Sequence, residues 1–286
     1  MFKRIALITN SDAPKVAETL NNLIDYLQGQ GIQIVLDTCS SAIVSKHDLP
    51  SADNEDLAMQ CDLAIAIGGD GTMLKAAHMV CNHDVPLLGI NRGRLGFLAD
   101  IPAEAINENL SAILQGEYKQ DERFLLHCQI MRDNQPVLES HAINDIIIQK
   151  WNIARLVEFE TYIDNTFVHK QRSDGIIVST PTGSTAYALA GGGPILYPSL
   201  DALVLVPICP HTLTNRPIVI DGNSHVEIVV GTREIDHARL TCDGDITAEL
   251  APGDRVSIRK KGKKIRLLHP ANHDHFSILR AKLRWG

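Results

Sequence analysis

The segment LAIAIGGDGT, residues 63–72, constrains the fold of this chain more than any other. Its first five residues are all apolar, which is typical of a strand buried on both faces of a parallel sheet. The run ends in a glycine-rich turn at residues 68–72, and the apolar residues that follow, from Met73 to Met79, have helical spacing. The segment therefore predicts a strand, a glycine turn and the start of a helix.

The glycine turn has the parts of a phosphate-binding site but an unusual charge. Glycines let the backbone approach a ligand closely, and the free N–H groups at a helix start attract anions. No Lys or Arg lies between Leu63 and Leu74, however, and Asp70 stands among the glycines. A carboxylate beside phosphates has a chemical reason when a metal ion is near or when it takes a proton from an attacking hydroxyl. The alternative is that Asp70 only caps a helix starting near Thr72.

Length and charge exclude several classes of protein. The 286 residues predict two domains, and 44% hydrophobic with 21% charged residues is typical of a globular protein. A net charge of −7 argues against a general nucleic-acid binder, and we expect the basic run 259–264 to form a solvated hairpin turn. No apolar run approaches the roughly 18 residues of a membrane span, and residues 5–8 are too short for a signal-peptide core. We therefore expect a cytoplasmic protein that binds neither nucleic acid nor membrane.

The pattern of the first 121 residues predicts an α/β domain with a doubly wound parallel sheet. Apolar strands alternate with amphipathic helices, which is the pattern of such folds. The predicted strands are 2–9, 32–36, 63–67 and 86–90, and the predicted helices are 15–28, 73–79 and 103–114. Ligands of doubly wound sheets bind at the carboxyl ends of strands, so we expect the glycine turn and the loop 91–96 to line a site.

From about residue 122 the pattern changes to short strands with alternating polarity. This predicts an all-β, sandwich-like domain over residues 122–269, with a two-residue hairpin at Asp164-Asn165. Residues 270–286 read as a weakly helical tail that packs back onto the first domain, 1–121. His269, His273 and His275 in this region have a spacing that suits a metal, but a structural or surface role is favoured because no partner motif lies nearby.

A second group of unusual residues surrounds the predicted strand 176–179. Arg172-Ser173-Asp174-Gly175 precedes this strand, and a loop rich in hydroxyls, residues 180–187, follows it. Small hydroxyl side chains beside a helix start can hydrogen-bond a polar ligand, and Tyr187 can stack on a base. The alternative is that these residues only form turns and caps, and Asn144-Asp145 is open to the same alternative.

Taken together and in this order, the glycine-aspartate turn, residues 91–98, Asn144-Asp145, residues 172–175 and residues 180–187 resemble the NAD kinases of the bacterial type. The turn alone is also found in diacylglycerol and sphingosine kinases and in phosphofructokinases, whereas the combination is specific. The chain has no G-x-x-x-x-G-K-[ST] motif and no G-x-G-x-x-G motif after a strand, so neither a P-loop nor the usual dinucleotide fold is expected.

The resemblance implies transfer of the γ-phosphoryl group of ATP to the 2′-hydroxyl of the adenosine ribose of NAD, giving NADP and ADP. It implies a divalent ion, Mg²⁺, without assigning side-chain ligands to it, and it implies a homo-oligomer, either a dimer or a tetramer. Asp70 would be the general base, and the phosphate-binding turn would be Gly68, Gly69, Gly71 and Thr72. The NAD or nucleotide site implied by the resemblance consists of Asp70, Gly71, Asn144, Asp145, Arg155, Arg172, Asp174, Thr185, Ala186, Tyr187, Ala188, Leu189, Ala190 and Asp245.

Two other functions remain open on the sequence. One is a kinase for lipids or a sugar phosphate that shares the glycine-aspartate turn, although no apolar entrance for a lipid is apparent. The other is a catalytically silent sensor that binds NAD, which the presence of Asp70 disfavours.

Overall fold

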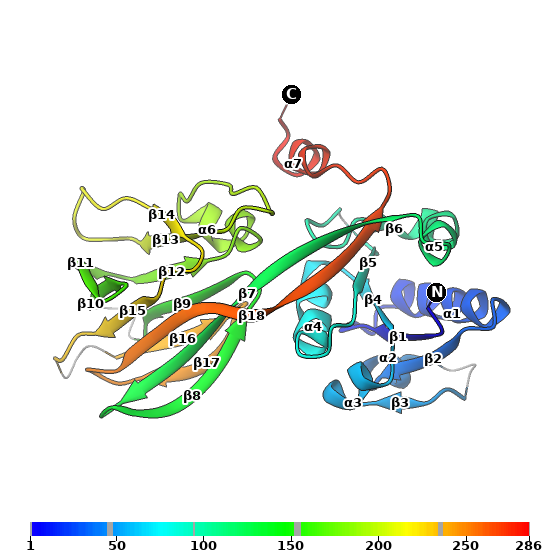
Figure 1. The fold of residues 1–286 in the computed structure, drawn as a ribbon, viewed down its shortest axis with the longest axis horizontal. Helices are drawn as coiled ribbons and strands as arrows, with labels where there is room; N and C mark the ends of the chain where they lie inside the picture. The colour runs from blue at the N-terminus through cyan, green and yellow to red at the C-terminus, as the bar shows by residue number, and fades with distance from the viewer. Residues whose placement is uncertain (1, 45–47, 94, 152–155, 234–236, 286) are drawn as a thin grey trace. The chain divides into compact units, whose positions relative to one another are not determined.

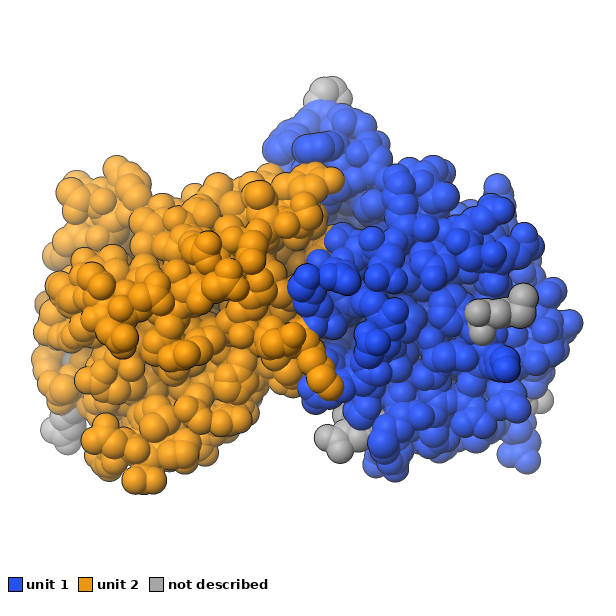
Figure 2. Space-filling view, viewed as in Figure 1, with its two compact units in different colours: residues 1–122, 264–286 blue, residues 123–263 orange. Residues whose placement is uncertain are grey.

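The computed structural model describes residues 2–44, 48–93, 95–151, 156–233 and 237–285. They form two compact units, which Figure 2 distinguishes by colour. Unit 1 contains Met1–Glu122 and Lys264–Gly286, and unit 2 contains Arg123–Lys263. Two long strands, β7 (Tyr118–Arg132) and β18 (Arg255–Pro270), contribute residues to both units.

Unit 1 is an α/β domain built on parallel strands (Figure 1). Its sheet has the order β3-β2-β1-β4-β5, and the end of β18 pairs in parallel with β5. Its remaining elements are β1 (Arg4–Ile8), α1 (Pro14–Gly29), β2 (Gln33–Asp37), α2 (Thr38–Ile43), β3 (Ser51–Ala52), α3 (Asn54–Met59), β4 (Leu63–Gly68), α4 (Asp70–Val80), β5 (Leu87–Asn91), β6 (Ile101–Pro102), the 3₁₀ helix η1 (Ala103–Ala105), α5 (Ile106–Leu114) and α7 (His275–Leu283). The strand order reverses direction at β1 and β4, which makes their carboxyl ends the topological switch point where such sheets bind ligands.

Helices cover both faces of the unit 1 sheet. The apolar residues of α1 and α5 form one core with alternate residues of the strands, such as Leu7, Ile65 and Leu88. Helix α4 covers the other face (Figure 1). A Cβ at Gly89 of β5 would come within 2.7 Å of the Met73 sulfur. The sheet is therefore buried on both sides, which explains why its strands are continuous apolar runs.

Unit 2 is an antiparallel β structure. One sheet has six strands in the order β14-β13-β12-β9-β16-β17, and a second layer contains β10, β11, β15 and the first part of β18, with β7 and β8. Its other elements are β8 (Gln135–Ala142), β9 (Asp145–Lys150), β10 (Val157–Ile163), β11 (Thr166–Ser173), β12 (Gly175–Ser179), η2 (Gly183–Thr185), α6 (Tyr187–Ala190), β13 (Ala202–Ile208), β14 (Ile218–Asp221), β15 (Val226–Val230), β16 (Ala238–Cys242) and β17 (Asp245–Leu250).

Both faces of the six-stranded sheet are buried. One face shares a core with the second layer, in which Phe159, Ile176 and Ile258 have no exposed surface. The other face packs on the segment around α6, through a smaller core that includes Ile177, Ala188 and Leu196. The segment that follows β12 is thereby fixed against the sheet.

The predicted fold class is confirmed, with an α/β first domain and an antiparallel second one. The expected hairpin at Asp164-Asn165 is present, and both residues have positive φ, as a type I′ turn requires. The expected hairpin turn over residues 259–264 is wrong, because these residues lie inside the continuous strand β18. Their charges are exposed or paired there, for example Lys260 with Asp201 at 2.6 Å. No helix in the described ranges is long and apolar enough to cross a bilayer.

Candidate functional site

Three turns of unit 1 meet at the carboxyl ends of its parallel strands. Gly68 at the end of β4 is the register partner of Asn91 at the end of β5, and the Arg92 N–H donates to the Gly68 carbonyl at 3.0 Å. The Thr72 hydroxyl donates to Asn10 Oδ1, which follows β1, at 2.5 Å. The turns after β1, β4 and β5 are thus hydrogen-bonded to one another at the switch point of the sheet.

Asp70 is the first residue of α4, but it does not cap this helix. Its carboxylate accepts three backbone N–H groups from the loop after β5: Phe97 to Oδ2 at 2.9 Å, Leu98 to Oδ1 at 2.9 Å and Ala99 to Oδ1 at 3.2 Å. Gly96 is required beside it, since a Cβ there would overlap Asp70 Oδ1. The helix-capping alternative is therefore wrong, and the carboxylate instead joins the glycine turn to the neighbouring loop.

Two cationic side chains lie near these turns although the glycine turn itself carries none. Lys75, one helical turn into α4, donates to the Thr9 carbonyl and to Asp37 Oδ2, both at 2.7 Å. Arg92 lines a pocket of about 350 Å³ together with Lys15, Asn91, Gly93, Leu95, Pro102 and Glu104. A larger hollow of about 500 Å³ beside α1 and α5 is lined by none of these residues.

In unit 2, strand register brings Asn144 and Asp145 of the predicted NAD site to one edge of the six-stranded sheet, where β9 begins and β12 and β16 end. Asp145 at the start of β9 pairs with Ser179 at the end of β12, and Ile146 pairs with Cys242 at the end of β16. The turn after β16 contains Asp243, whose carboxylate accepts the N–H groups of Ile143, Asn144 and Asp145 at 2.8, 2.7 and 3.3 Å. Asp243 therefore holds the start of β9 in place.

The Asp145 side chain is only 3% exposed. Burial raises the pKa of Asp145 to about 7, and the charges of Asp243 and Cys242 act in the same direction. Asp145 therefore changes its charge near neutral pH, so it can serve as a hydrogen-bond donor or as an acceptor for a polar ligand.

The loop after β12 is packed against the Asn144 backbone. Thr180 donates through its N–H to the Asn144 carbonyl at 2.9 Å, and its hydroxyl donates to the Ile143 carbonyl at 2.6 Å. Gly183 approaches the Asn144 carbonyl so closely that a Cβ would overlap its oxygen. Tyr187 remains 45% exposed at the start of α6. The loop thus presents an accessible aromatic ring from a rigid support.

Two family models match this chain. The ATP-NAD kinase N-terminal domain matches residues 5–118, and the ATP-NAD kinase C-terminal domain matches residues 143–269. The chain belongs to the ATP-NAD kinase family. NAD kinases from Nitrosococcus oceani and Marinomonas sp. are 47% and 45% identical to it over 285 residues, which span 100% of this chain and 97% of each relative.

Solved structures of an NADH kinase and of an NAD kinase have a fold similar to that of this chain. Yeast NADH kinase complexed with NADH superposes with a TM-score of 0.89 at 26% identity, over 98% of this chain and 86% of that chain. An NAD kinase from Archaeoglobus fulgidus in complex with ATP superposes with a TM-score of 0.75 at 24% identity, over 98% of each chain.

The remaining residues that the NAD kinase resemblance singled out have different placements. Arg172, in β11, and Asp174, between β11 and β12, precede Gly175, which is separated from Ser179 at the other end of β12 by roughly 13 Å along the strand. Asp174 is paired with Lys150 at 2.6 Å, and Arg172 is exposed. Asp245 is exposed at the start of β17, while Ala188 is buried in the core beneath α6. Arg155 lies outside the described residues.

Three features of the candidate site in this NAD kinase family member were missed by sequence reasoning. They are the backbone N–H groups of residues 97–99, the side chain of Lys75 and the carboxylate of Asp243. A signal existed only for Asp243, because Asp243-Gly244, which joins β16 to β17, is a hairpin turn of the Asp-Gly type. Backbone donors carry no sequence signal of their own.

Proposed function

We propose that this chain transfers the γ-phosphoryl group of ATP to the 2′-hydroxyl of the adenosine ribose of NAD, forming NADP and ADP. One observation carries the proposal: Asp70 lies at the switch point of a parallel sheet, in a chain that matches the ATP-NAD kinase models in both halves. Phosphoryl transfer depends on alignment and on neutralising charge, and a carboxylate that accepts the hydroxyl proton completes it.

The phosphates of ATP would bind at the turns around Gly68, Gly69, Gly71 and Thr72. In the described part of the chain no side chain caps the N-terminus of α4, a helix end of the kind that attracts anions, and Lys15 and Arg92 line the adjacent pocket. Mg²⁺ would neutralise charge on the phosphate oxygens. The donor set fits an ion that arrives with the nucleotide, because the Asp70 oxygens already accept three N–H groups and the Asp37 carboxylate is paired with Lys75.

Asp70 would act as the general base. The attacking 2′-oxygen would approach one carboxylate oxygen, which takes the proton as the phosphoryl group arrives. The three N–H groups from residues 97–99 would fix the direction of the carboxylate. Such preorientation reduces the freedom that must be lost on reaching the transition state.

Unit 2 would bind the dinucleotide. Asn144 and Asp145 lie at the same sheet edge as Thr185, Ala186 and Tyr187, which supports a shared site for a nucleoside. The backbone around Ala188, Leu189 and Ala190 would line it. Asp245, at the hairpin beside Asp243, would lie at its margin. Arg172 and Asp174 would contact the substrate away from this edge. Arg155, which is outside the described residues, would also contact the substrate.

An assay of NADP formation tests the proposal. Purified protein with ATP, Mg²⁺ and NAD should form NADP, and parallel reactions replace ATP by polyphosphate, NAD by NADH, or NAD by a panel of lipids and sugar phosphates. Phosphorylation of a lipid or sugar phosphate without NADP would support the rival kinase. Binding of NAD without any phosphorylation would support the silent sensor. Either result would end the proposal.

Substitution Asp70→Asn tests the general base. An amide cannot accept the proton, so we expect kcat to fall by about 10²–10⁴-fold while the dissociation constant of NAD changes little. The amide oxygen can still accept from Leu98 and Ala99, and only the bond from Phe97 is lost. Melting temperatures of both proteins show whether the loop stays folded. A kcat close to that of the wild type would contradict the assignment.

The proposal also covers the oligomeric state of the protein and its location in the cell. We expect a homo-oligomer of two or four chains, which the family resemblance supports, and a cytoplasmic location, where ATP and NAD are both present. Light scattering coupled to size exclusion measures the first, and a single-chain mass in solution would contradict it.

A further inference from the structure

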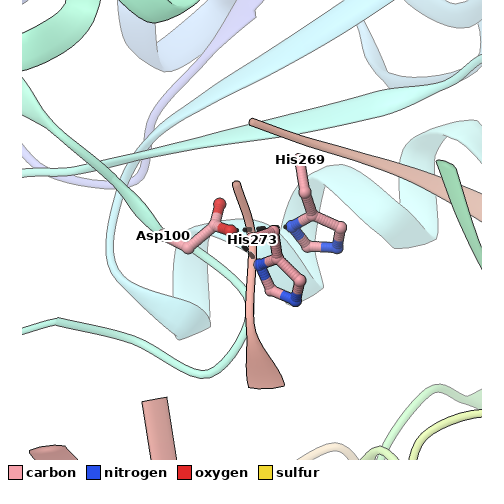
Figure 3. A group of neighbouring side chains, drawn as sticks. All are labelled: Asp100, His269 and His273. Carbon is pink, nitrogen blue, oxygen red and sulfur yellow. Dashed lines mark hydrogen bonds and ion pairs between the residues drawn. The ribbon is translucent and has the colours of Figure 1, made fainter. Parts of the chain in front are cut away.

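Asp100, His269 and His273 form a cluster in unit 1 that the proposed chemistry does not use (Figure 3). Asp100 precedes β6, His269 lies near the end of β18, and His273 lies just before α7. Both imidazoles face one carboxylate oxygen, and Asp100 Oδ2 lies 2.9 Å from His269 Nδ1 and 2.6 Å from His273 Nδ1. The rings stack with centroids 4.0 Å apart, and their exposed fractions are 1% for His269 and 13% for His273.

The contacts of the cluster are hydrogen bonds from two imidazoles to an ionised carboxylate. Burial by itself would raise the pKa of Asp100, but the hydrogen bonds and charges of His269 and His273 lower it below its ordinary value. The other oxygen, Oδ1, has no hydrogen-bond partner in the described part of the chain. The two histidines are therefore the side-chain anchors of the Asp100 carboxylate.

The same three side chains are of the kinds that hold a divalent metal, and their ligand atoms lie within 4.8 Å of one another. A tetrahedral zinc ion with nitrogen ligands at about 2.0–2.1 Å keeps its ligand atoms roughly 3.3 Å apart. The observed separations of 2.9 and 2.6 Å are hydrogen-bond lengths instead. The geometry favours the hydrogen-bonded arrangement over a metal site.

Asp100 directly follows residues 97–99, whose backbone N–H groups donate to the Asp70 carboxylate. Ala99, the residue before Asp100, donates its N–H to Asp70 Oδ1 at 3.2 Å, and its carbonyl accepts from the Asn91 side chain at 3.2 Å. Ala99 is fully buried, and a Cβ at Gly89 would lie 2.7 Å from its Cα. A shift of Asp100 therefore moves the N–H groups that orient the Asp70 carboxylate, because the loop has no free space beside it.

We propose that His269 and His273 are positioning residues for Asp70, acting through Asp100 and the backbone of residues 97–99. The end of β18 and the segment that follows it thereby set the direction of a carboxylate that lies early in the chain, since Asp100 and His269 are 169 positions apart. The inference rests on the proposed role of Asp70 as the general base. It predicts that loss of either histidine lowers the rate of the chemical step more than it weakens substrate binding.

Substitution of His273 is the first part of the test, because this residue is the more exposed of the two. His273→Leu removes the donor to Asp100, whereas His273→Asn keeps an N–H group near the position of Nδ1. We expect His273→Leu to lower kcat by about 10–100-fold, with KM for NAD within about 2-fold of the wild type, and His273→Asn to recover most of the loss. Arg266→Gln is the matched control, since it breaks a contact of β18 with Asp84 and leaves the cluster intact; it should retain full kcat.

A double-mutant cycle with Asp70→Asn separates positioning from a general structural effect. If the histidine acts through Asp70, adding His273→Leu to Asp70→Asn should lower kcat by less than about 2-fold further. Multiplicative losses in the double variant, an unchanged kcat in His273→Leu, or a loss that His273→Asn does not recover would overturn the inference. A wild-type kcat in Asp70→Asn alone would instead refute the proposed base, so the two failures are distinguishable.

Adding Zn²⁺ to the protein tests whether the cluster of Asp100, His269 and His273 binds a metal ion. With the purified, chelator-treated protein, we expect no change in melting temperature on adding the ion, for the wild type and for His273→Leu alike. A rise of several degrees in the wild type that is absent in His273→Leu would show a metal site and overturn the hydrogen-bonded arrangement.

Discussion

Two aspartates, Asp70 and Asp243, use their carboxylates in the same way. Each accepts three backbone N–H groups of a neighbouring segment, residues 97–99 for Asp70 and residues 143–145 for Asp243. An ionised carboxylate is a strong acceptor for several N–H groups, and bonds to a charged group contribute more than neutral ones. One side chain therefore holds a whole loop, which explains how residues without regular structure stay fixed at the candidate site.

Asp145 gives the chain a predictable pH dependence of stability. The pKa of Asp145 is raised to about 7 by burial and by Asp243 and Cys242, above the value of about 3.9 in the unfolded chain. The folded state therefore binds the proton more tightly, so the contribution of Asp145 to stability is largest below pH 4. It decreases as the pH rises through 7, where the buried group becomes charged.

Substitution Asp145→Asn should remove this pH dependence. Asparagine is neutral at every pH, so we expect the variant to be more stable than the wild type at pH 8, by on the order of 2–4 kcal/mol, and equally stable near pH 4. Urea unfolding at both pH values measures the difference. Asp245→Asn, at an exposed neighbouring position, should change stability little at either pH. A gain of the same size at pH 4 and pH 8 would rule out titration of Asp145 as the cause.

Among the secondary-structure elements, those determined by local sequence were predicted well. Helix α1 and strands β4 and β5 follow their apolar periodicity, and the hairpin at residues 164–165 follows turn residues that adopt positive φ. Helix α2 was missed. It has six residues without an apolar stripe, and it is fixed at its start by Asp37, which accepts the Ser40 N–H at 2.9 Å. Asp37 also binds Lys75 of α4, so α2 depends on contacts distant in the sequence.

The loop between β12 and α6 depends on one glycine for its contact with β9. Substitution Gly183→Ala would drive a Cβ into the Asn144 carbonyl, and backbone atoms cannot move aside as a flexible side chain does. We expect a loss of about 1–3 kcal/mol in the free energy of unfolding. A KM for NAD about 10-fold higher, equivalent to about 1.4 kcal/mol, should accompany it.

Gly262→Ala is the control for this substitution, because no atom lies within 4 Å of the added Cβ. Its stability and KM should match those of the wild type. Unchanged kinetics and stability in Gly183→Ala would show that the loop tolerates displacement from β9.

For the whole molecule, the main feature is that unit 1 is built from two separate parts of the chain. Residues 264–286 return to it, and Leu267 and Leu268 of β18 pair with Leu87 and Leu88 of β5. The two chain breaks of the unit lie close together, since Lys264 and Glu122 form an ion pair at 2.8 Å. A short linker can therefore replace unit 2 between them.

This arrangement predicts the behaviour of two fragments. Residues 1–122 alone lack the end of β18 and its buried leucines, each of which contributes about 2–3 kcal/mol, so the fragment should not unfold cooperatively in urea. Residues 1–122 joined through a Gly-Ser linker to residues 264–286 should fold and show a sigmoidal transition by circular dichroism. Cooperative unfolding of the 1–122 fragment alone would contradict the prediction.

The sequence by itself determined the alternation of strands and helices in the first half, the hairpins of the second and the glycine turn with Asp70, because propensity, periodicity and turn chemistry act within a few residues. Tertiary structure alone decided that the N–H groups of residues 97–99 bind Asp70 and that Asp243 holds Asn144. It also decided that His269 and His273 meet at Asp100. These contacts join residues far apart in the chain, and only the register of the strands and the packing of the elements brings them within hydrogen-bond distance.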